Sequence, residues 1–263
     1  RAQLDLVIGN HLSRQEKWKE ALEPLVRALG TFERLAGPRD AKTGEALTRL
    51  GNVQTRLGAF DEAERSHGRA LEIFSETLGP EHPRTATSLD QLAKVLTQQG
   101  RFSQAQVMHE RALSVREKAL GAERPQTLLS MANLGSALSQ QGEYARAQDL
   151  LERAASGWER HYGVKDERLA SLLNPLANAL ARQGRYVQAE QAYRRGLDIF
   201  QKSLAADNPR FGNALTGLGA CYVLSNAGKK AVPLLERALA IREKDNTAAR
   251  DVGETRFFLA QAL

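Results

Sequence analysis

The feature that most constrains this chain is a repeat of 42 residues that runs along its whole length. One position of the repeat is usually glycine and recurs without an insertion or deletion, at Glu16, Gly58, Gly100, Gly142, Gly184 and Asn226. Five residues later, alanine occupies every copy, at Ala21, Ala63, Ala105, Ala147, Ala189 and Ala231. A single short repeat cannot bury its apolar face alone, so repeats of this kind stack on one another. We therefore predict a stack of six similar units.

Each copy has the apolar periodicity of two consecutive helices. In the third copy, the first apolar stripe recurs at spacings of three and four residues, at Leu89, Leu92, Ala93 and Leu96. Such spacing places these side chains on one face of a helix. The stripe breaks at Gly100 and a second one begins at Phe102. Two helices joined by so short a break lie antiparallel and in contact.

A column of small residues predicts where the two helices of each pair cross closely. Its members are Gly9, Gly51, Ala93, Gly135, Ala177 and Gly219. A larger side chain at this position would push the helices apart. A separate column is aromatic in the first five copies and is expected to fill the wider gap beside the crossing, at Trp18, Phe60, Phe102, Tyr144 and Tyr186.

These small, glycine, aromatic and alanine columns resemble the tetratricopeptide repeat, a helix-turn-helix unit of about 34 residues. The additional residues here lengthen the second helix and its exit loop, as in RALEIFSETLGPEHPRTA at 69–86. This longer form resembles the repeats of kinesin light chain, which bacterial multidomain signalling proteins also use. The resemblance implies an all-α, right-handed superhelical solenoid of six antiparallel helix pairs plus the first helix of a seventh.

The repeat register predicts one array over residues 1–263. We expect repeats at approximately 1–42, 43–84, 85–126, 127–168, 169–210 and 211–252, with the first helix of a seventh at 253–263. Terminal repeats are often atypical because one of their faces meets solvent. The last helix nevertheless carries the apolar residues Phe257, Phe258 and Leu259, which would make a poor polar cap. We therefore expect the chain to be a segment of a longer protein.

Composition and charge argue against several classes of protein. The lone Cys221 cannot form an internal disulfide, and no apolar run approaches the roughly 20 residues of a membrane helix. No secretory signal is recognisable, so we expect a cytoplasmic protein. The formal net charge is +6, but basic residues alternate with acidic ones, as in DEAERSHGRALE at 61–72. This modest, mixed charge disfavours a nucleic-acid partner, and the absence of a long apolar run predicts no membrane partner.

No pattern in the chain predicts catalysis. There is no HExxH, CxxC or GxSxG motif, so we expect a protein that is not an enzyme and holds no cofactor or metal. His67 and His109 share a column with Leu25 and are expected to be packing residues. His11 and Cys221 share another column with valine and alanine, which predicts core positions for both.

The segment AGPRDAKT at 36–43 is similar to a phosphate-binding loop. Alanine replaces both required glycines, at Ala36 and Ala41. The segment is also the 42-residue equivalent of LGPEHPRT at 78–85. We therefore interpret it as a loop between repeats.

The resemblance implies that the first helix of each pair lines the concave surface. Positions separated by three or four residues share one face of these helices, away from the core stripe. The candidate partner-binding residues on that face are Asn10, Arg49, Asn52, Arg56, Gln91, Lys94, Asn133, Ser136, Asn174, Asn178, Arg182 and Asn213. In the fifth copy, Pro175 takes one of these positions and interrupts the row of amides.

The chemistry of these candidates favours an extended, acidic peptide or a partner domain as the ligand. Asparagine and glutamine amides can pair with a peptide backbone, and arginine pairs with carboxylates. Asparagine is a poor helix former, so its recurrence favours a binding role over a merely solvated helix face. We expect a non-catalytic interaction scaffold, as in the regulatory arm of a larger signalling protein. Two alternatives remain: a structural arm that self-associates through its ends, and a sensor of a small peptide.

Overall fold

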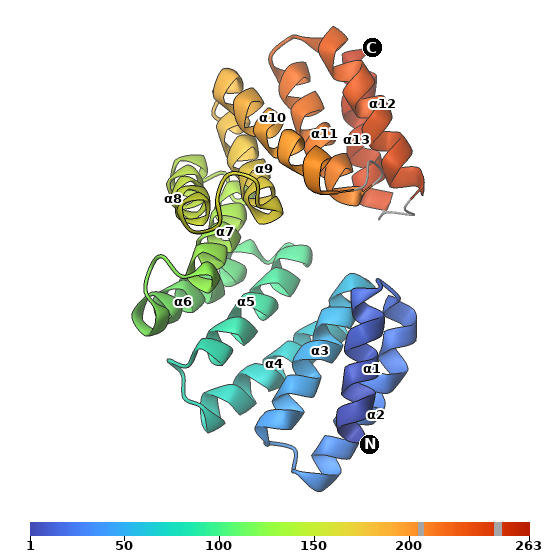
Figure 1. Ribbon diagram of the computed structural model, residues 1–263, viewed down its shortest axis with the longest axis vertical. Coiled ribbons are helices and arrows are strands. Elements are labelled where there is room, and N and C mark those ends of the chain that lie inside the picture. The colour runs from blue at the N-terminus through green and yellow to red at the C-terminus, as the bar shows by residue number, and fades with distance from the viewer. Residues whose placement is uncertain (205–207, 245–248) are drawn as a thin grey trace. The chain divides into compact units, whose positions relative to one another are not determined.

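The computed structural model describes residues 1–204, 208–244 and 249–263, and within these ranges every regular element is a helix. The first helices of the pairs are α1 (Ala2–Arg14), α3 (Ala41–Arg56), α5 (Pro83–Gln98), α7 (Pro125–Gln140), α9 (Glu167–Arg182) and α11 (Pro209–Leu224). The second helices are α2 (Trp18–Leu35), α4 (Phe60–Thr77), α6 (Phe102–Leu120), α8 (Tyr144–Tyr162), α10 (Tyr186–Ser203) and α12 (Gly228–Lys244). A further helix, α13 (Ala249–Ala262), follows them (Figure 1). The described residues thus confirm the all-α prediction of six pairs and one additional helix.

Contacts divide the chain into two compact units, residues 1–133 and residues 134–263. The boundary falls inside α7. In the first unit α1 packs on α2, α3 on α4, and α5 on α6. In the second unit α9 packs on α10, α11 on α12, and α13 on both α11 and α12. No described helix is long and apolar enough to cross a membrane.

First helices begin about two residues before the expected repeat boundaries because polar caps precede the apolar pattern. The side chains of Asp40, Asp166 and Asn208 accept hydrogen bonds from the amides two residues later. These bonds satisfy amide groups that a helix N-terminus leaves without partners. Pro83 and Pro209 occupy the first helical turn, where the missing N–H costs least. The loop 36–40 connects α2 to α3, which confirms that AGPRDAKT joins two repeats.

The column of small residues lies where the helices of a pair approach most closely. A Cβ atom added to Gly135 would lie 2.7 Å from Cγ of Leu151, and one added to Gly219 would lie 2.6 Å from Leu235. In the second pair the opposing side chain is His67, whose ring would lie 2.8 Å from a Cβ at Gly51. The prediction of a close crossing is therefore confirmed.

The buried histidines are packing residues, as predicted. Burial lowers the pKa of His67 to about 4, so its ring is neutral at pH 7. His109 is also buried. Cys221 is in the core, and burial raises the pKa of its thiol to about 11.

The prediction of a core position for His11 is wrong. His11 is exposed and one of its ring nitrogens, Nε2, lies 2.9 Å from Nε2 of Gln15. Val53 and Val95 occupy the same column and are buried. They lie in α3 and α5, which pack against the second helix of the preceding pair. Among the described residues, no helix precedes α1 to cover His11.

The two helices of a pair are joined by a residue in the left-handed backbone conformation. Gly100 has a φ of 77°, and the next amide, of Arg101, donates to the carbonyl of Leu96 at 2.8 Å. Glu16 takes the same conformation in the first pair with a φ of 61°. Side chains with a Cβ disfavour this region by about 1–2 kcal/mol. The first pair therefore carries backbone strain that glycine would relieve.

Another column of the repeat contributes an arginine to a buried polar cluster in residues 1–133. The column is filled by buried aromatic residues at Phe32, Phe74, Trp158 and Phe200, but by arginine at Arg116 and Arg242. The terminal nitrogens of Arg116 donate to Asp90 and Ser130 and, at 3.0 Å, to Thr87. His109 Nδ1 lies 2.7 Å from the other oxygen of Asp90.

Asp90 compensates the buried charge of Arg116. The two residues are only 3% and 6% exposed. Burial raises the pKa of Asp90, but the hydrogen bond from His109 and the charge of Arg116 outweigh it. The pKa of Asp90 therefore lies below its ordinary value.

Replacing Glu16 with glycine should stabilise the first helix pair by about 1 kcal/mol, because glycine adopts a positive φ without a steric penalty. Native-state hydrogen exchange of the α2 amides would measure this change. The reverse change, Gly58→Ala, should destabilise the second pair by a similar amount. Unchanged or faster exchange of α2 in the Glu16→Gly variant would contradict the interpretation.

Replacing Asp90 with asparagine should lower the free energy of unfolding by about 3–5 kcal/mol, because Arg116 would remain buried without a countercharge. Urea denaturation of the full chain at pH 7 would measure the loss. Asp61 is exposed and serves as the control, since Asp61→Asn should change stability by less than about 0.5 kcal/mol. Equal effects of the two changes would contradict a compensating role for Asp90.

The pH dependence follows from the lowered pKa of Asp90. The stability that this carboxylate contributes is fully present above its unfolded pKa, about 3.9, and is lost as the pH falls through its folded pKa. The stability difference between the wild type and Asp90→Asn should therefore narrow as the pH falls below about 4. Denaturation curves across this range would test this, and a difference that stayed constant would contradict it.

Candidate functional site

The twelve predicted partner-binding residues all lie in first helices, and none of them is buried. The exposed members are Arg49, Arg56, Lys94, Asn178, Arg182 and Asn213. The half-buried members are Asn10, Asn52, Gln91, Asn133, Ser136 and Asn174. The fold therefore leaves these polar side chains within reach of solvent. Their role in binding stays a prediction.

In residues 1–133, Arg56 of α3 and Lys94 of α5 form a cationic surface. The guanidinium of Arg56 lies 5.4 Å from the ring centre of Trp18. Desolvation by surrounding atoms lowers the pKa of Lys94; Asp90 opposes this, while Arg116 and Arg56 lower it further. Within the described residues neither Arg56 nor Lys94 has an ion-pair partner. A negatively charged group of a ligand would therefore be attracted to this surface and could pair with its cations.

Arg49 and Asn174 are less available for binding a partner than the sequence suggests. Arg49 lies 3.8 Å from the carboxylate of Glu45, one turn earlier on α3. The side-chain oxygen of Asn174 is buried without a hydrogen-bond partner. It lies 3.3 Å from where a Cβ of Gly196 would stand, so the absence of that Cβ makes room for it between α9 and α10.

Residues 134–263 contain a cavity of about 460 Å³ that brings together three of the predicted residues, Asn178, Arg182 and Asn213. Arg242, Asp251 and Glu254 also line it, together with apolar side chains that include Leu224 and Phe258. We refer to it as the Arg242 cavity. Its walls come from α7 and from α9 to α13. It therefore lies between α13 and the polar faces of two first helices, α9 and α11.

Both asparagines in the Arg242 cavity use their side-chain oxygens within the protein. The hydroxyl of Tyr193 bonds to the oxygen of Asn178, and burial raises the pKa of this tyrosine. Nη2 of Arg242 donates to the oxygen of Asn213 at 3.0 Å. A Cβ at Gly217 would lie 2.5 Å from the Tyr193 ring, so glycine is needed there to admit the ring. Each amide oxygen thus already accepts one hydrogen bond from within the protein, and each amide can also donate through its NH₂ group.

Arg242 is the member of this site that sequence reasoning missed. It is 3% exposed, and its Nε and Nη1 atoms have no hydrogen-bond partner. Nη1 forms an ion pair with the carboxylate of Asp251 at 3.6 Å, a separation too long for a hydrogen bond. The sequence does contain a signal that could have identified Arg242, because arginine replaces an aromatic residue there in the repeat column of Phe32 and Phe200.

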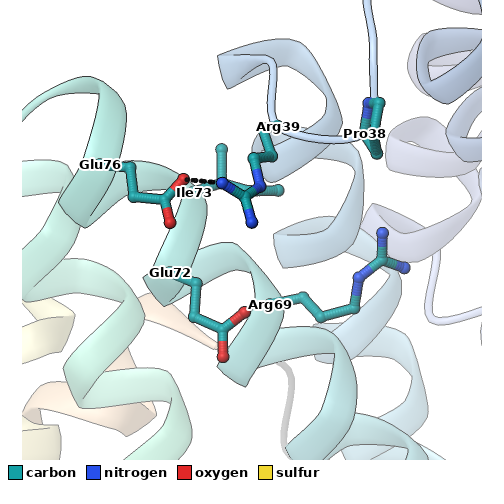
Figure 2. Close-up of a pocket in the computed structure, with 6 residues that line it drawn as sticks. All are labelled: Pro38, Arg39, Arg69, Glu72, Ile73 and Glu76. Carbon is teal, nitrogen blue, oxygen red and sulfur yellow. Dashed lines mark ion pairs between the residues drawn. The ribbon is translucent and has the colours of Figure 1, made fainter.

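A smaller cavity of about 170 Å³ lies between the loop 36–40 and α4. Figure 2 shows Arg39 pointing toward Glu76, 3.5 Å away. Arg69 also lines this cavity, and its guanidinium is 2.7 Å from the carboxylate of Glu33. Both arginines are thus already paired with carboxylates, which disfavours phosphate binding by this loop.

The described residues contain no group of three or more histidine, cysteine or acidic side chains placed to hold a metal ion. The buried cluster of Asp90, His109 and Ser130 includes the side-chain types of a hydrolytic triad. Ser130, however, donates to Asp90 at 2.9 Å, and all three residues are buried. A substrate could not reach them in this arrangement.

The chain is similar in fold to solved repeat structures. BtubC (BKLC) from P. vanneervenii is 22% identical with a TM-score of 0.69, over 88% of this chain and 93% of that chain. The nearly identical TPR-like repeats assigned to a kinesin light chain of Podosopora anserina are 23% identical with a TM-score of 0.61, over 78% and 97%. A Rap protein complexed with Competence and Sporulation Factor is 17% identical with a TM-score of 0.70, over 99% and 74%.

These likenesses confirm the expected fold of kinesin-light-chain-like repeats. A search of curated proteins finds no match. The tetratricopeptide repeat family matches residues 1–74, 46–118, 104–160 and 168–244. Because these matches extend over most of the sequence, the chain belongs to the tetratricopeptide repeat family.

Proposed function

We propose that this chain is a non-catalytic scaffold that binds an extended, acidic segment of a partner protein through its first helices. The observation that carries this proposal is the cationic surface of Arg56 and Lys94, on two packed repeats, without an ion pair among the described residues. An unpaired cation that is partly desolvated binds a carboxylate more strongly than a fully solvated one does.

The amides beside these cations add hydrogen-bonding capacity. Asn52 precedes Arg56 by one helical turn, and Gln91 stands three residues before Lys94. Residues three and four apart lie on one face of a helix, so each cation has an amide as its neighbour. An amide offers both a donor and an acceptor to the backbone of an extended peptide. Carboxylates of the partner would pair with the cations, and its backbone with the amides.

A similar fold supports the idea that such repeats hold another molecule. One of the similar structures is a Rap protein in complex with Competence and Sporulation Factor. From this similarity we propose a class of function for the chain, that of a protein-binding scaffold. We further propose that the scaffold is the regulatory arm of a larger signalling protein in the cytoplasm. We also propose that residues 1–263 form a single array of repeats.

Self-association is a second candidate function, and exposed apolar side chains on α13, on the residue that follows it and on α1 favour it. Phe257 is 57% exposed and Leu263 is 87% exposed. On α1, Leu4 and Val7 are also exposed. Exposed apolar surface of this kind is typical of interaction sites.

The scaffold proposal predicts that removing the first-helix side chains abolishes partner binding without unfolding the chain. The test variant carries Asn52→Ala, Arg56→Ala, Lys94→Ala and Asn133→Ala. None of these residues is buried, so stability should fall little, which circular dichroism would check. Affinity capture from native lysate with wild type and variant side by side would measure the loss of the partner.

A matched control removes two cations and two amides from second helices instead. It carries Lys19→Ala, Arg111→Ala, Gln104→Ala and Gln191→Ala, all at exposed positions. The control should keep the partner that the first-helix variant loses. If both variants keep the partner, the binding surface lies elsewhere and the proposal is wrong.

Self-association predicts that the molar mass rises with concentration and that Phe257→Lys abolishes the rise, because a charge would be buried at the contact. Light scattering over a concentration series would measure this. Gln261→Lys places the same charge at an exposed polar position of α13 and should leave the association unchanged. A constant mass equal to one chain would exclude this second function.

A further inference from the structure

Lys94 is an exposed amine beside a carboxylate that is already engaged by other residues. Asp90 stands one helical turn before Lys94 on α5, a spacing that places both side chains on one face of the helix. One oxygen of Asp90 lies 2.7 Å from Nδ1 of His109. The other accepts hydrogen bonds from Arg116 and Ser130. Among the described residues, Lys94 therefore has a carboxylate nearby but no ion-pair partner.

Two arginines place positive charge around this amine. Arg116 is buried, and the guanidinium of Arg56 on α3 lies 5.4 Å from the ring centre of Trp18. Helices α3 and α5 contact each other, and Lys94 occupies on α5 the repeat position that Asn52 occupies on α3. Arg56 follows Asn52 by one helical turn, on the same face of α3. The charges of both arginines act on Lys94.

This environment favours the neutral form of the amine. Desolvation by surrounding atoms lowers the pKa of Lys94, and Asp90 opposes this change. The charges of Arg116 and Arg56 lower it further. His67 of α4 also interacts with Lys94, but burial lowers the pKa of His67 to about 4, so its ring is neutral at pH 7. A lowered pKa leaves more of the amine uncharged, and only the uncharged amine has the lone pair of a nucleophile.

The surrounding cations favour a reagent whose product is negatively charged. An acyl donor would convert the amine into a neutral amide, which would gain no ion pair with Arg56. Carbon dioxide converts it into a carbamate, which carries one negative charge and two acceptor oxygens. A guanidinium pairs with two such oxygens at once. The amides of Asn52 and Gln91, on the same two helices, can donate further hydrogen bonds.

We propose that Lys94 is a carbon dioxide-binding residue, which reacts reversibly to form a carbamate that Arg56 stabilises. The lone pair of Nζ attacks the carbon of carbon dioxide and forms an N–C bond, while one C=O electron pair moves onto oxygen. The nitrogen then releases a proton to water. A neutral amine and carbon dioxide thus yield a carbamate anion and a proton. The proposal goes beyond the proposed scaffold function and does not depend on it.

Carbamate formation would reverse the charge of Lys94 from positive to negative. The cationic surface of Arg56 and Lys94 would then carry no net charge from these two side chains. An acidic ligand would be attracted to it less strongly. If the scaffold proposal also holds, carbon dioxide therefore weakens the binding of the partner.

The test is incubation of the full chain with ¹³C-labelled bicarbonate, which exchanges with dissolved carbon dioxide, at pH 8. A carbamate resonance should appear in ¹³C nuclear magnetic resonance spectra and saturate as bicarbonate is added. Ethylation of the carbamate with a trialkyloxonium salt, followed by peptide mass spectrometry, locates the modified amine. Labelling of Lys94 should exceed that of Lys19, an exposed lysine on α2, by at least about tenfold.

Paired variants separate the amine from its surroundings. Lys94→Arg keeps the positive charge but removes the amine, so the resonance of the modified lysine should be lost, whereas Lys19→Arg should leave it unchanged. Arg56→Gln removes a cation that both lowers the pKa of Lys94 and pairs with the carbamate, so labelling should fall about three- to tenfold. Arg65→Gln removes a cation from an exposed position of α4 and should have no effect. Circular dichroism would check that each variant is folded.

Three results would overturn the proposal: no carbamate resonance, labelling of Lys94 no greater than that of Lys19, or unchanged labelling in Arg56→Gln. None of these measurements needs a partner. If no carbamate forms while the first-helix variant still loses its partner, the carbamate site is wrong and the scaffold proposal stands. If the carbamate forms while that variant keeps its partner, the scaffold surface is wrong and the carbamate site stands.

Discussion

The close crossing of two helices in each repeat is the constraint on which the rest of the structure depends. Gly135 faces Leu151 and Gly219 faces Leu235 at distances that leave no room for a Cβ atom. With the crossing so tight, the second helix supplies the large side chain and the first helix supplies the gap. The apolar side chains are therefore buried between the helices, and the remaining face of each first helix can carry polar groups.

This division explains how much of the fold could be predicted from sequence alone. The small column predicted the crossings, and the glycine column predicted the turns, because both depend only on residues within one repeat. The core position predicted for His11 was wrong, since burial of that column requires a preceding pair that α1 lacks among the described residues. Whether a column is buried thus depends on the neighbouring repeat as well as on its own pattern.

The candidate site was less predictable than the fold because its hydrogen bonds join different helices. Periodicity predicted that Asn178 and Asn213 would stay at least partly exposed, and both are exposed. It could not predict that their oxygens would be taken by Tyr193 and Arg242. The two buried arginines share one column, yet Arg116 donates a hydrogen bond to its countercharge Asp90, while Arg242 lies 3.6 Å from its countercharge Asp251 and leaves Nε and Nη1 without a hydrogen bond. Only the three-dimensional arrangement distinguishes them.

The central claim is that first-helix side chains which the fold leaves within reach of solvent recognise an acidic, extended segment. Selection of binders from a random 12-residue peptide library on the full chain tests it most directly. We predict that the selected peptides are enriched in aspartate and glutamate and that added salt weakens their binding. Enrichment of basic or uncharged apolar peptides, with affinity independent of salt, would contradict the account.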